Sequence, residues 1–402
     1  MNSSFEVFLN MLISYLNGKK FNTELKINWN DIVKLAEIHN VQGMIYIALQ
    51  NSSVEIPSEV LNTLNKAFVA TVTYSVQQEM EMERVKSAFK KANVDMVLMK
   101  GYLIKKYYPS SELRTMGDVD FLIRAGDRQK SDEVLKSIGF EFVEKESGAS
   151  VWNYIKGNVL LEVHTSIIYQ QLFLGIDYSK YFSNVFNYIE EKSHNIYEMK
   201  PEYHFIYVLV HFAKHLYRVG SGIRMVMDVV VLLNKCGKDY DWDFIWKELG
   251  DIKLLDFTKR LFCMCYKYFD CYVPENCKNG NDKVSEAFMV YVLKAGIFGQ
   301  YNRDSYSVKF NLTEDEDKTK KIQYRVKNLL QILFPDYDTM YGWFAWFRGK
   351  PKWYLPIGWV RRWIVNWKYK RESIFQKLKG AVIANEDSLE HNEIMKKIGL
   401  FK

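Results

Sequence analysis

The spacing of apolar residues changes twice along this chain of 402 residues. From its start to about residue 92, apolar residues such as Phe5, Phe8 and Leu12 recur every three or four positions, which is typical of helices. The apolar runs become short and alternating at Val94, and the helical spacing returns at about Tyr178. We therefore expect an α+β fold, in which N-terminal helices and a C-terminal helical domain flank a small mixed sheet.

The length of the chain predicts several packed units, because one hydrophobic core stops growing at ~250–300 residues. We expect an N-terminal helical region over 1–92, an α/β core over 93–175 and a helical domain over 176–335. A segment rich in tryptophan and basic residues follows over 336–402, and the polar stretch from Lys309 to Lys320 is predicted to be a loop.

Turn residues and apolar periods place the individual elements. In the N-terminal region, a second helix should start near Asp31 and continue through Leu49, and a long third helix should run from Pro57 to Lys91. The α/β core should hold about five strands. Its predicted elements are a strand over 94–99 that turns at Lys100-Gly101, helices over 102–108 and 127–138, strands over 119–123 and 140–144, and a hairpin of strands 151–156 and 159–164 around Gly157-Asn158.

Two aspartates lie in the strand over 119–123 or at its start. Because successive side chains of a strand point to opposite faces, Asp118 and Asp120 share one face, while Val119, Phe121 and Ile123 point into the core. A rise of about 3.3 Å per residue places the two carboxylates about 6.6 Å apart along the strand. A simple solvated strand face is the alternative to a metal site here. Aspartate is depleted in strands, which favours the metal site. Such oxygen ligands suit two Mg²⁺ ions about 3.5–4 Å apart.

Neighbouring segments supply groups that suit the same chemistry. Glu162 and His164 alternate with core residues in the second hairpin strand, so they share its polar face. A third carboxylate is what a two-metal site uses to position and deprotonate an attacking hydroxyl. Lys100 and Gly101 lie where a strand turns into a helix, and backbone N–H groups and a lysine charge at such a turn bind phosphate.

Several motifs occur together in a fixed order. They are Met99-Lys-Gly-Tyr-Leu103, then Arg114 followed by Asp118-x-Asp120, then Leu161-Glu-Val-His164, and later His211-Phe-Ala-Lys-His215 with Arg224 and Asp228. This set resembles the motifs of the uncharacterised bacterial nucleotidyltransferases of family 5, within the DNA polymerase β-like superfamily. The resemblance covers about residues 30–235, and more loosely Leu333-Phe-Pro335.

The resemblance implies transfer of a nucleoside monophosphate from an NTP to an unknown acceptor hydroxyl or phosphate, with release of pyrophosphate. Asp118 and Asp120 would bind two Mg²⁺ ions, and Glu162 would be the third metal-binding carboxylate and help to activate the acceptor. Lys100 and Gly101 would contact the triphosphate.

Further residues are assigned to the nucleotide. Arg114 would bind phosphate or brace the aspartates, and His164 would also contribute to the nucleotide site. In the wider superfamily, a Gly-Ser turn places a hydroxyl on the phosphates, whereas Tyr102 follows Gly101 here. The phosphate contacts would then come from backbone N–H groups and Lys100.

Two alternative functions share the same fold. A nucleotidyltransferase toxin would modify tRNA or a protein, for which the formal net charge of +7 is suitable. A non-catalytic module would bind nucleotide without releasing pyrophosphate, and the lack of a serine at Tyr102 permits that hypothesis.

Two pairs on the later helices have competing interpretations. His211 and His215 lie one helical turn apart, a spacing that can bind zinc. No Glu follows His211, so packing on the α/β core is favoured, with Lys214 or His215 lining a nucleotide cleft between the two units. Arg224 and Asp228, four residues apart, are predicted to form a pair on a helix surface.

The C-terminal segment concentrates aromatic and basic residues. Six of the 10 tryptophans lie from Trp343 to Trp367, interleaved with Lys and Arg residues. Trp359, Trp363 and Trp367 recur every four residues and so share one helix face. Three hypotheses follow: packing on the helical domain, contact with a membrane surface, or stacking on single-stranded nucleic acid.

Cysteine usage and hydropathy bear on the compartment. Four of the five cysteines cluster between Cys263 and Cys277 without the paired spacing of a zinc site, and we expect reduced thiols. No N-terminal leader pattern and no run of 18 uncharged apolar residues is present. We expect a cytoplasmic protein, and the alternative is a protein that also contacts a membrane surface.

Overall fold

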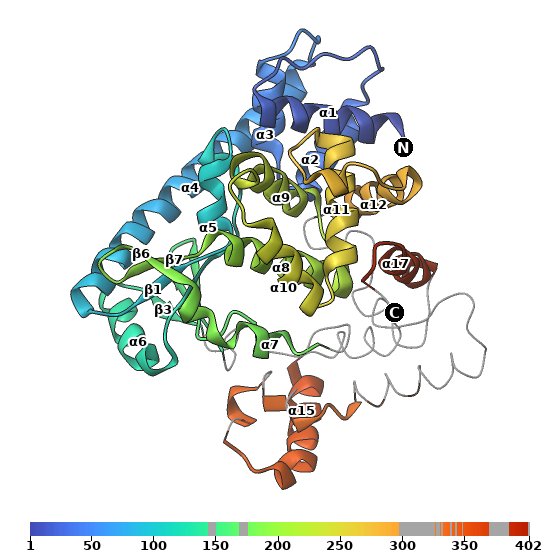
Figure 1. Ribbon diagram of the computed structural model, residues 1–402. Coiled ribbons are helices and arrows are strands. Elements are labelled where there is room, and N and C mark those ends of the chain that lie inside the picture. Colours follow the sequence, from blue (N-terminus) through green and yellow to red (C-terminus); the bar gives the residue numbers. More distant parts are fainter. Residues whose placement is uncertain are drawn as a thin grey trace.

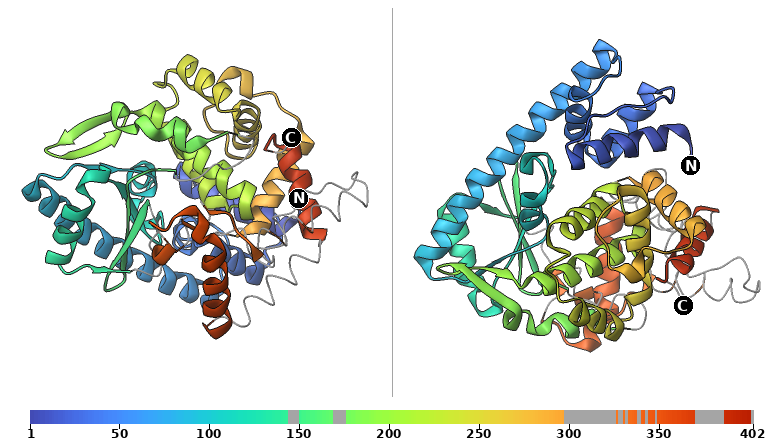
Figure 2. Two further views of the ribbon diagram at one scale, coloured as in Figure 1. Left: turned by 90° about the horizontal axis from the view of Figure 1, so that it is seen from below. Right: turned by 45° about the horizontal axis from the view of Figure 1, so that its top comes forward.

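A mixed sheet lies between two sets of helices (Figure 1). The computed structural model describes residues 1–143, 150–168, 176–296, 349–369 and 386–400, with short pieces between 326 and 347. The long helix α4 (Ser58–Ala92) runs along one side of the sheet, and the later helices lie on the other side (Figure 2). The predicted α+β class is confirmed.

The N-terminal region contains three helices before α4. They are α1 (Ser3–Asn17), α2 (Trp29–His39) and α3 (Gln42–Gln50). The prediction of one continuous helix from Asp31 through Leu49 is wrong, because Asn40 adopts a left-handed conformation with a φ of 52° and ends α2. The turn allows α3 to pack against both α1 and α4.

Seven strands form the sheet in the order β3-β4-β5-β2-β1-β7-β6. Their bounds are β1 (Met96–Leu98), β2 (Val119–Leu122), β3 (Glu141–Phe142), β4 (Val151–Lys156), β5 (Val159–His164), β6 (Ile189–Ser193) and β7 (Ile196–Met199). The predicted hairpin is β4 and β5, which pair antiparallel. Strand β2 lies near the centre, antiparallel to β1 and parallel to β5.

Strands β6 and β7 lie in a part of the chain that was predicted to be helical. They follow the short helix α7 (Tyr178–Tyr181), and β7 pairs parallel with β1, so the sheet continues beyond the predicted core boundary at 175. The prediction of helix from Tyr178 onward is therefore wrong for this hairpin. Its strand β6 is an exposed edge with the charged run Glu190-Glu191-Lys192, so it lacks the alternating apolar pattern that identifies a strand.

The two faces of the sheet have different roles. Val119 and Phe121 point to the face covered by α4 and by α6 (Arg128–Ser137), where the Phe89 and Phe121 rings meet edge to face at 5.5 Å. The opposite face carries Asp120 and Glu162 and meets α8 (Pro201–Val219) and α9 (Ile223–Cys236). Because helices cover both faces, all four residues of β2 are buried, whereas the alternation predicted a half-buried strand.

Helices α8 and α9 begin the predicted helical domain, and α10 (Trp242–Asp251), α11 (Leu255–Phe269), α12 (Asp282–Ala295) and α17 (Glu386–Lys397) continue it. The predicted loop from Lys309 to Lys320 lies outside the described residues. All five cysteines are free thiols. Among the described helices, none is long and apolar enough to span a membrane.

Candidate active site

The register between β2 and β5 brings two acidic side chains together. Asp120 lies directly opposite Glu162 in this parallel pair, and Leu122 lies opposite His164. Like charges at directly opposed positions destabilise a sheet. Two strands that bring carboxylates together in this way therefore need positive charge nearby, from a side chain or from a metal ion.

These side chains form a compact group of metal-binding type. Ligand atoms of Asp120, Glu162 and His164 all lie within 4.8 Å of one another. Among the described residues, this is the one group of three or more His, Cys, Asp and Glu side chains that is arranged in this way. Asp118 lies just before β2, and its carboxyl group shares a hydrogen bond with Glu162.

Lys100 provides a positive charge at the same point. Its ammonium group forms an ion pair with Oδ1 of Asp120. Burial alone would lower the pKa of Lys100, but the neighbouring groups, led by the Asp120 carboxylate, together outweigh burial and raise that pKa. The Lys100 backbone has a φ of 52°, which is rare for a residue with a side chain and indicates strain at this turn.

His164 is a second partner of Asp120. Its Nε2 lies 2.8 Å from Oδ1 of Asp120 and 3.4 Å from Oε2 of Glu162. Burial opposes ionisation of Asp120, yet Lys100 and His164 together hold the pKa of Asp120 far below its usual range. The other nitrogen of His164, Nδ1, is buried without a hydrogen-bond partner in the described part of the chain. Metal-binding histidines normally donate from that second nitrogen, so this geometry favours His164 as a donor to Asp120.

The remaining carboxylates carry excess negative charge. Burial, followed by the charges of Asp120 and Glu162, raises the pKa of Asp118 from 3.8 to about 6. Three carboxylates face one lysine here, and oxygen-only ligands suit Mg²⁺. The chemistry of Asp118, Asp120 and Glu162 therefore fits a divalent cation.

This excess charge predicts that Asp118→Asn stabilises the metal-free protein. The folded-state pKa lies above the unfolded value, so the stability from protonated Asp118 is present below pH 3.8 and is lost as the pH rises through about 6. At pH 7.5 the ionised group opposes folding. The substitution should therefore raise the free energy of unfolding by about 1–2 kcal/mol at pH 7.5 and by less at pH 4. Urea unfolding in EDTA measures this, and a loss of stability at pH 7.5 contradicts it.

A buried ion pair with Asp228 holds Arg114 away from the carboxylates of the proposed metal site. Its Nε lies 3.1 Å from Oδ1 of Asp228, and its Nη2 lies 2.5 Å from Oδ2. The guanidinium group covers Gly101, where a Cβ atom would lie only 2.3 Å from Nη1. Arg114 thus links the turn that carries Lys100 to α9, which is a bracing position.

The predicted surface pair between Arg224 and Asp228 is wrong. Asp228 is 4% exposed and also accepts a hydrogen bond of 2.7 Å from the Tyr108 hydroxyl. Arg224 donates from Nη1 to the carbonyl and the hydroxyl of Thr115, both at 2.8 Å. Arg224 and Asp228 of α9 therefore both bind the segment that leads into β2. The unbroken aliphatic run at residues 229–233 of α9 is the sequence signal for a buried helix, in which charges need buried partners.

Gly101→Ala should disturb this brace. The added methyl group would overlap the guanidinium of Arg114, which cannot easily withdraw because Asp228 holds it. We expect a loss of about 1–3 kcal/mol in the free energy of unfolding. Gly250→Ala in α10 is the matched control, because its Cβ would meet nothing within 4 Å. Equal unfolding midpoints for the two variants would show that Arg114 moves freely.

A cleft of about 420 Å³ opens above the carboxylates, between the sheet and the helical domain. Lys100, Asp118 and Glu162 line one wall. Lys214 and His215 of α8 line another, together with residues of α9. This volume lies within the ~300–1,000 Å³ typical of small-molecule sites.

His211 lies in the same wall of the cleft as a neutral group. Its ring centroid is 4.5 Å from that of His215, and burial, followed by the charge of His215, holds the pKa of His211 well below its usual value. The pair belongs to no metal-binding group within the described residues. The structure thus places both histidines against the α/β core, where they line the cleft.

Tyr102 points away from this cleft. Its hydroxyl donates a hydrogen bond of 2.7 Å to Oε1 of Glu79 on α4, and the ammonium of Lys105 lies 4.6 Å from the centre of its ring. The Tyr102 hydroxyl therefore does not replace the serine of the superfamily turn. At this turn, Lys100 and the backbone N–H groups remain as the groups that could contact phosphate.

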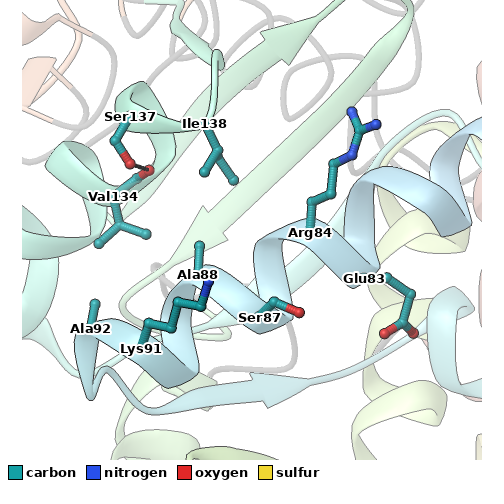
Figure 3. Close-up of a pocket in the computed structure, with 9 residues that line it drawn as sticks. All are labelled: Glu83, Arg84, Ser87, Ala88, Lys91, Ala92, Val134, Ser137 and Ile138. Atoms are coloured by element: carbon teal, nitrogen blue, oxygen red, sulfur yellow. Dashed lines mark hydrogen bonds between the residues drawn. The ribbon is translucent and has the colours of Figure 1, made fainter.

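A second hollow lies between α4 and α6 (Figure 3). Its single carboxylate is Glu83, and no histidine or cysteine lines it. The side chains of Glu83 and Arg84 point in different directions (Figure 3). Of these two hollows, only the cleft above Asp118, Asp120 and Glu162 gathers the groups needed for phosphoryl chemistry.

The site combines carboxylates on neighbouring strands with a cleft between the sheet and a helical domain. These features are typical of a nucleotidyltransferase. Residues 26–270 match the model of a family described as uncharacterised nucleotidyltransferases. The match spans more than half of the chain, so the protein belongs to this family, and the resemblance drawn from the motifs is confirmed. No curated protein and no solved structure matches the chain.

Proposed function

We propose that the protein transfers a nucleoside monophosphate from an NTP to an acceptor hydroxyl or phosphate, with Mg²⁺ bound by Asp118, Asp120 and Glu162. The observation that carries this proposal is the register of β2 and β5, which sets Asp120 opposite Glu162 on the face that lines the cleft. Membership of a nucleotidyltransferase family supports the reaction class.

Each carboxylate has a distinct environment for this reaction. Asp120 is the most buried and is fixed by Lys100 and His164, so it provides a rigid ligand. The side chain of Glu162 is 26% exposed toward the cleft and is the group best placed to accept the proton of the attacking hydroxyl. Bound Mg²⁺ would neutralise charge on the transferred phosphoryl group.

Cationic groups around the cleft suit the triphosphate. Lys100 lies beside the carboxylates, and Lys214 with His215 lies on the opposite wall. When a cation takes over the charge of Asp120, Lys100 becomes available as a point charge for phosphate. Transfer then depends on alignment of the acceptor with the NTP and on charge neutralisation.

One observation favours a second candidate, a module that binds nucleotide without turnover. Oδ1 of Asp120 already bonds both the Lys100 ammonium and His164, so part of the negative charge is neutralised without a metal. Such a protein would be stabilised by an NTP equally with and without Mg²⁺, and it would release no pyrophosphate.

Labelled substrate tests the proposal. The protein, Mg²⁺ and α-labelled NTPs are incubated with fractions of small molecules, RNA and protein, and both the label and pyrophosphate are followed. Transfer with pyrophosphate release supports the proposal, and the labelled fraction identifies the acceptor class, including tRNA or protein for a toxin. Nucleotide binding with no pyrophosphate from any NTP contradicts it.

Glu162→Gln should lower the transfer rate by about 100-fold or more, because it removes the proposed proton acceptor and one metal ligand. Glu198→Gln is the matched control, since Glu198 is a strand residue of the same sheet whose side chain is 23% exposed against 26% for Glu162. The control should keep the wild-type rate. Equal rates for both variants would remove Glu162 from the mechanism.

A further inference from the structure

Helix α15 (Leu355–Tyr369) has an inner face made by two tryptophans. The indole N–H of Trp359 donates to the carbonyl of Pro335 at 2.7 Å, and that of Trp363 donates to the carbonyl of Leu333 at 3.0 Å. Both rings lie against Phe334, with centroids 5.1 and 5.2 Å away. Trp359 and Trp363 therefore pack on residues 333–335, at the end of the predicted helical domain, while the side chain of Trp367 lies outside the described part.

The opposite face of α15 is apolar and exposed. Ile357, Val360 and Ile364 are 48%, 50% and 59% exposed, and their spacing of three and four residues places them in one line. Trp353, just before the helix, is 72% exposed. We call these four residues the α15 stripe. Figure 1 shows α15 at the lower edge of the molecule, away from α1 and α3.

The segment that contains the stripe has basic residues but no acidic ones. From Trp343 to Arg371 the sequence contains Lys and Arg at eight positions and no Asp or Glu. Two of these cations are held by aromatic rings beside the stripe: Arg361 lies 4.4 Å from the ring centre of Trp346, and Lys350 lies 5.7 Å from that of Tyr354. An exposed aliphatic line in a basic segment with fixed positive charges is complementary to an anionic, partly apolar surface.

We propose that the α15 stripe docks on the surface of a lipid bilayer that contains anionic headgroups. Aliphatic side chains and an exposed tryptophan enter the interface between headgroups and acyl chains, while Lys350, Lys352 and Arg361 contact phosphates. Single-stranded nucleic acid is disfavoured, because stacking of successive bases needs a row of free aromatic faces. Trp359 and Trp363 are turned inward, and three of the four residues of the stripe are aliphatic. The proposal is independent of the nucleotidyl transfer reaction.

Co-sedimentation of the full chain with vesicles tests the proposal. We expect binding to phosphatidylcholine vesicles that contain phosphatidylglycerol, and at least about tenfold weaker binding to phosphatidylcholine alone. The triple variant Ile357→Ser/Val360→Ser/Ile364→Ser should lose more than about tenfold in affinity. Val69→Ser/Val76→Ser/Met80→Ser is its matched control on α4, since these residues are 53%, 46% and 55% exposed. The control should bind as the wild type does.

The contribution of the basic residues to vesicle binding is tested in the same way. Lys350→Gln/Lys352→Gln/Arg361→Gln should lower affinity for anionic vesicles on the order of 100-fold, at about fivefold for each charge. Lys19→Gln/Lys20→Gln/Lys66→Gln, which removes three exposed charges elsewhere, should leave most of the binding intact. Far-UV circular dichroism of each variant confirms folding. Vesicle binding that survives the serine substitutions overturns the proposal, and so does binding to an oligonucleotide but to no vesicle.

Discussion

Asp228→Ala should lower the free energy of unfolding by about 3–5 kcal/mol, the usual cost of leaving one member of a buried ion pair without its partner. The substitution strands the Arg114 guanidinium, which has only 11% of its side chain exposed, and it removes the acceptor of the Tyr108 hydroxyl. Urea unfolding followed by circular dichroism measures the effect. The cost arises from desolvated charge, so Arg114→Met/Asp228→Leu together should recover most of it.

A surface aspartate provides the control for this prediction. The side chain of Asp251 is 65% exposed, and it lies 3.7 Å from Lys247 on α10. Exposed pairs of this kind contribute little, so Asp251→Ala should cost less than about 1 kcal/mol. Similar losses for Asp228→Ala and Asp251→Ala would mean that the Arg114 pair does not hold α9 to the turn at Gly101.

Asp118→Asn/Asp120→Asn should abolish transfer, with a fall of at least about 1,000-fold in rate. Both substitutions remove negative oxygen ligands from the proposed Mg²⁺ site, and the Lys100 ammonium then lacks its counterion. Asp251→Asn is the control and should keep full activity. Asp118→Asn alone separates function from folding, because it should remove activity while it stabilises the metal-free protein.

The α/β core was predictable because its signals are local. Alternation placed Val119 and Phe121 in the core and Asp120 on the other face, and the Gly157-Asn158 turn marked the hairpin that carries Glu162. The in-register contact between Asp120 and Glu162 depends on a parallel pairing between strands about 40 residues apart, which spacing along the chain suggests but does not determine.

Other features depend on tertiary contacts that no local pattern encodes. Strand β6 is an exposed, charged edge, so the β6-β7 hairpin lacked an apolar signal. The partner of Asp228 is Arg114, which lies 114 positions away, whereas the spacing of four residues pointed to Arg224. The direction of Tyr102 was decided by Glu79 on α4, since that carboxylate offers its hydroxyl a partner outside the cleft.

Nucleotide-dependent stability is the most direct test of the proposed metal site. The melting temperature is measured for the wild type and for Asp118→Asn/Asp120→Asn, with each NTP in the presence of Mg²⁺ or of EDTA. We expect that at least one NTP stabilises the wild type only when Mg²⁺ is present, and that the double variant shows no such shift. A wild type with no Mg²⁺-dependent shift, or a double variant that retains it, would contradict the assignment of Asp118 and Asp120.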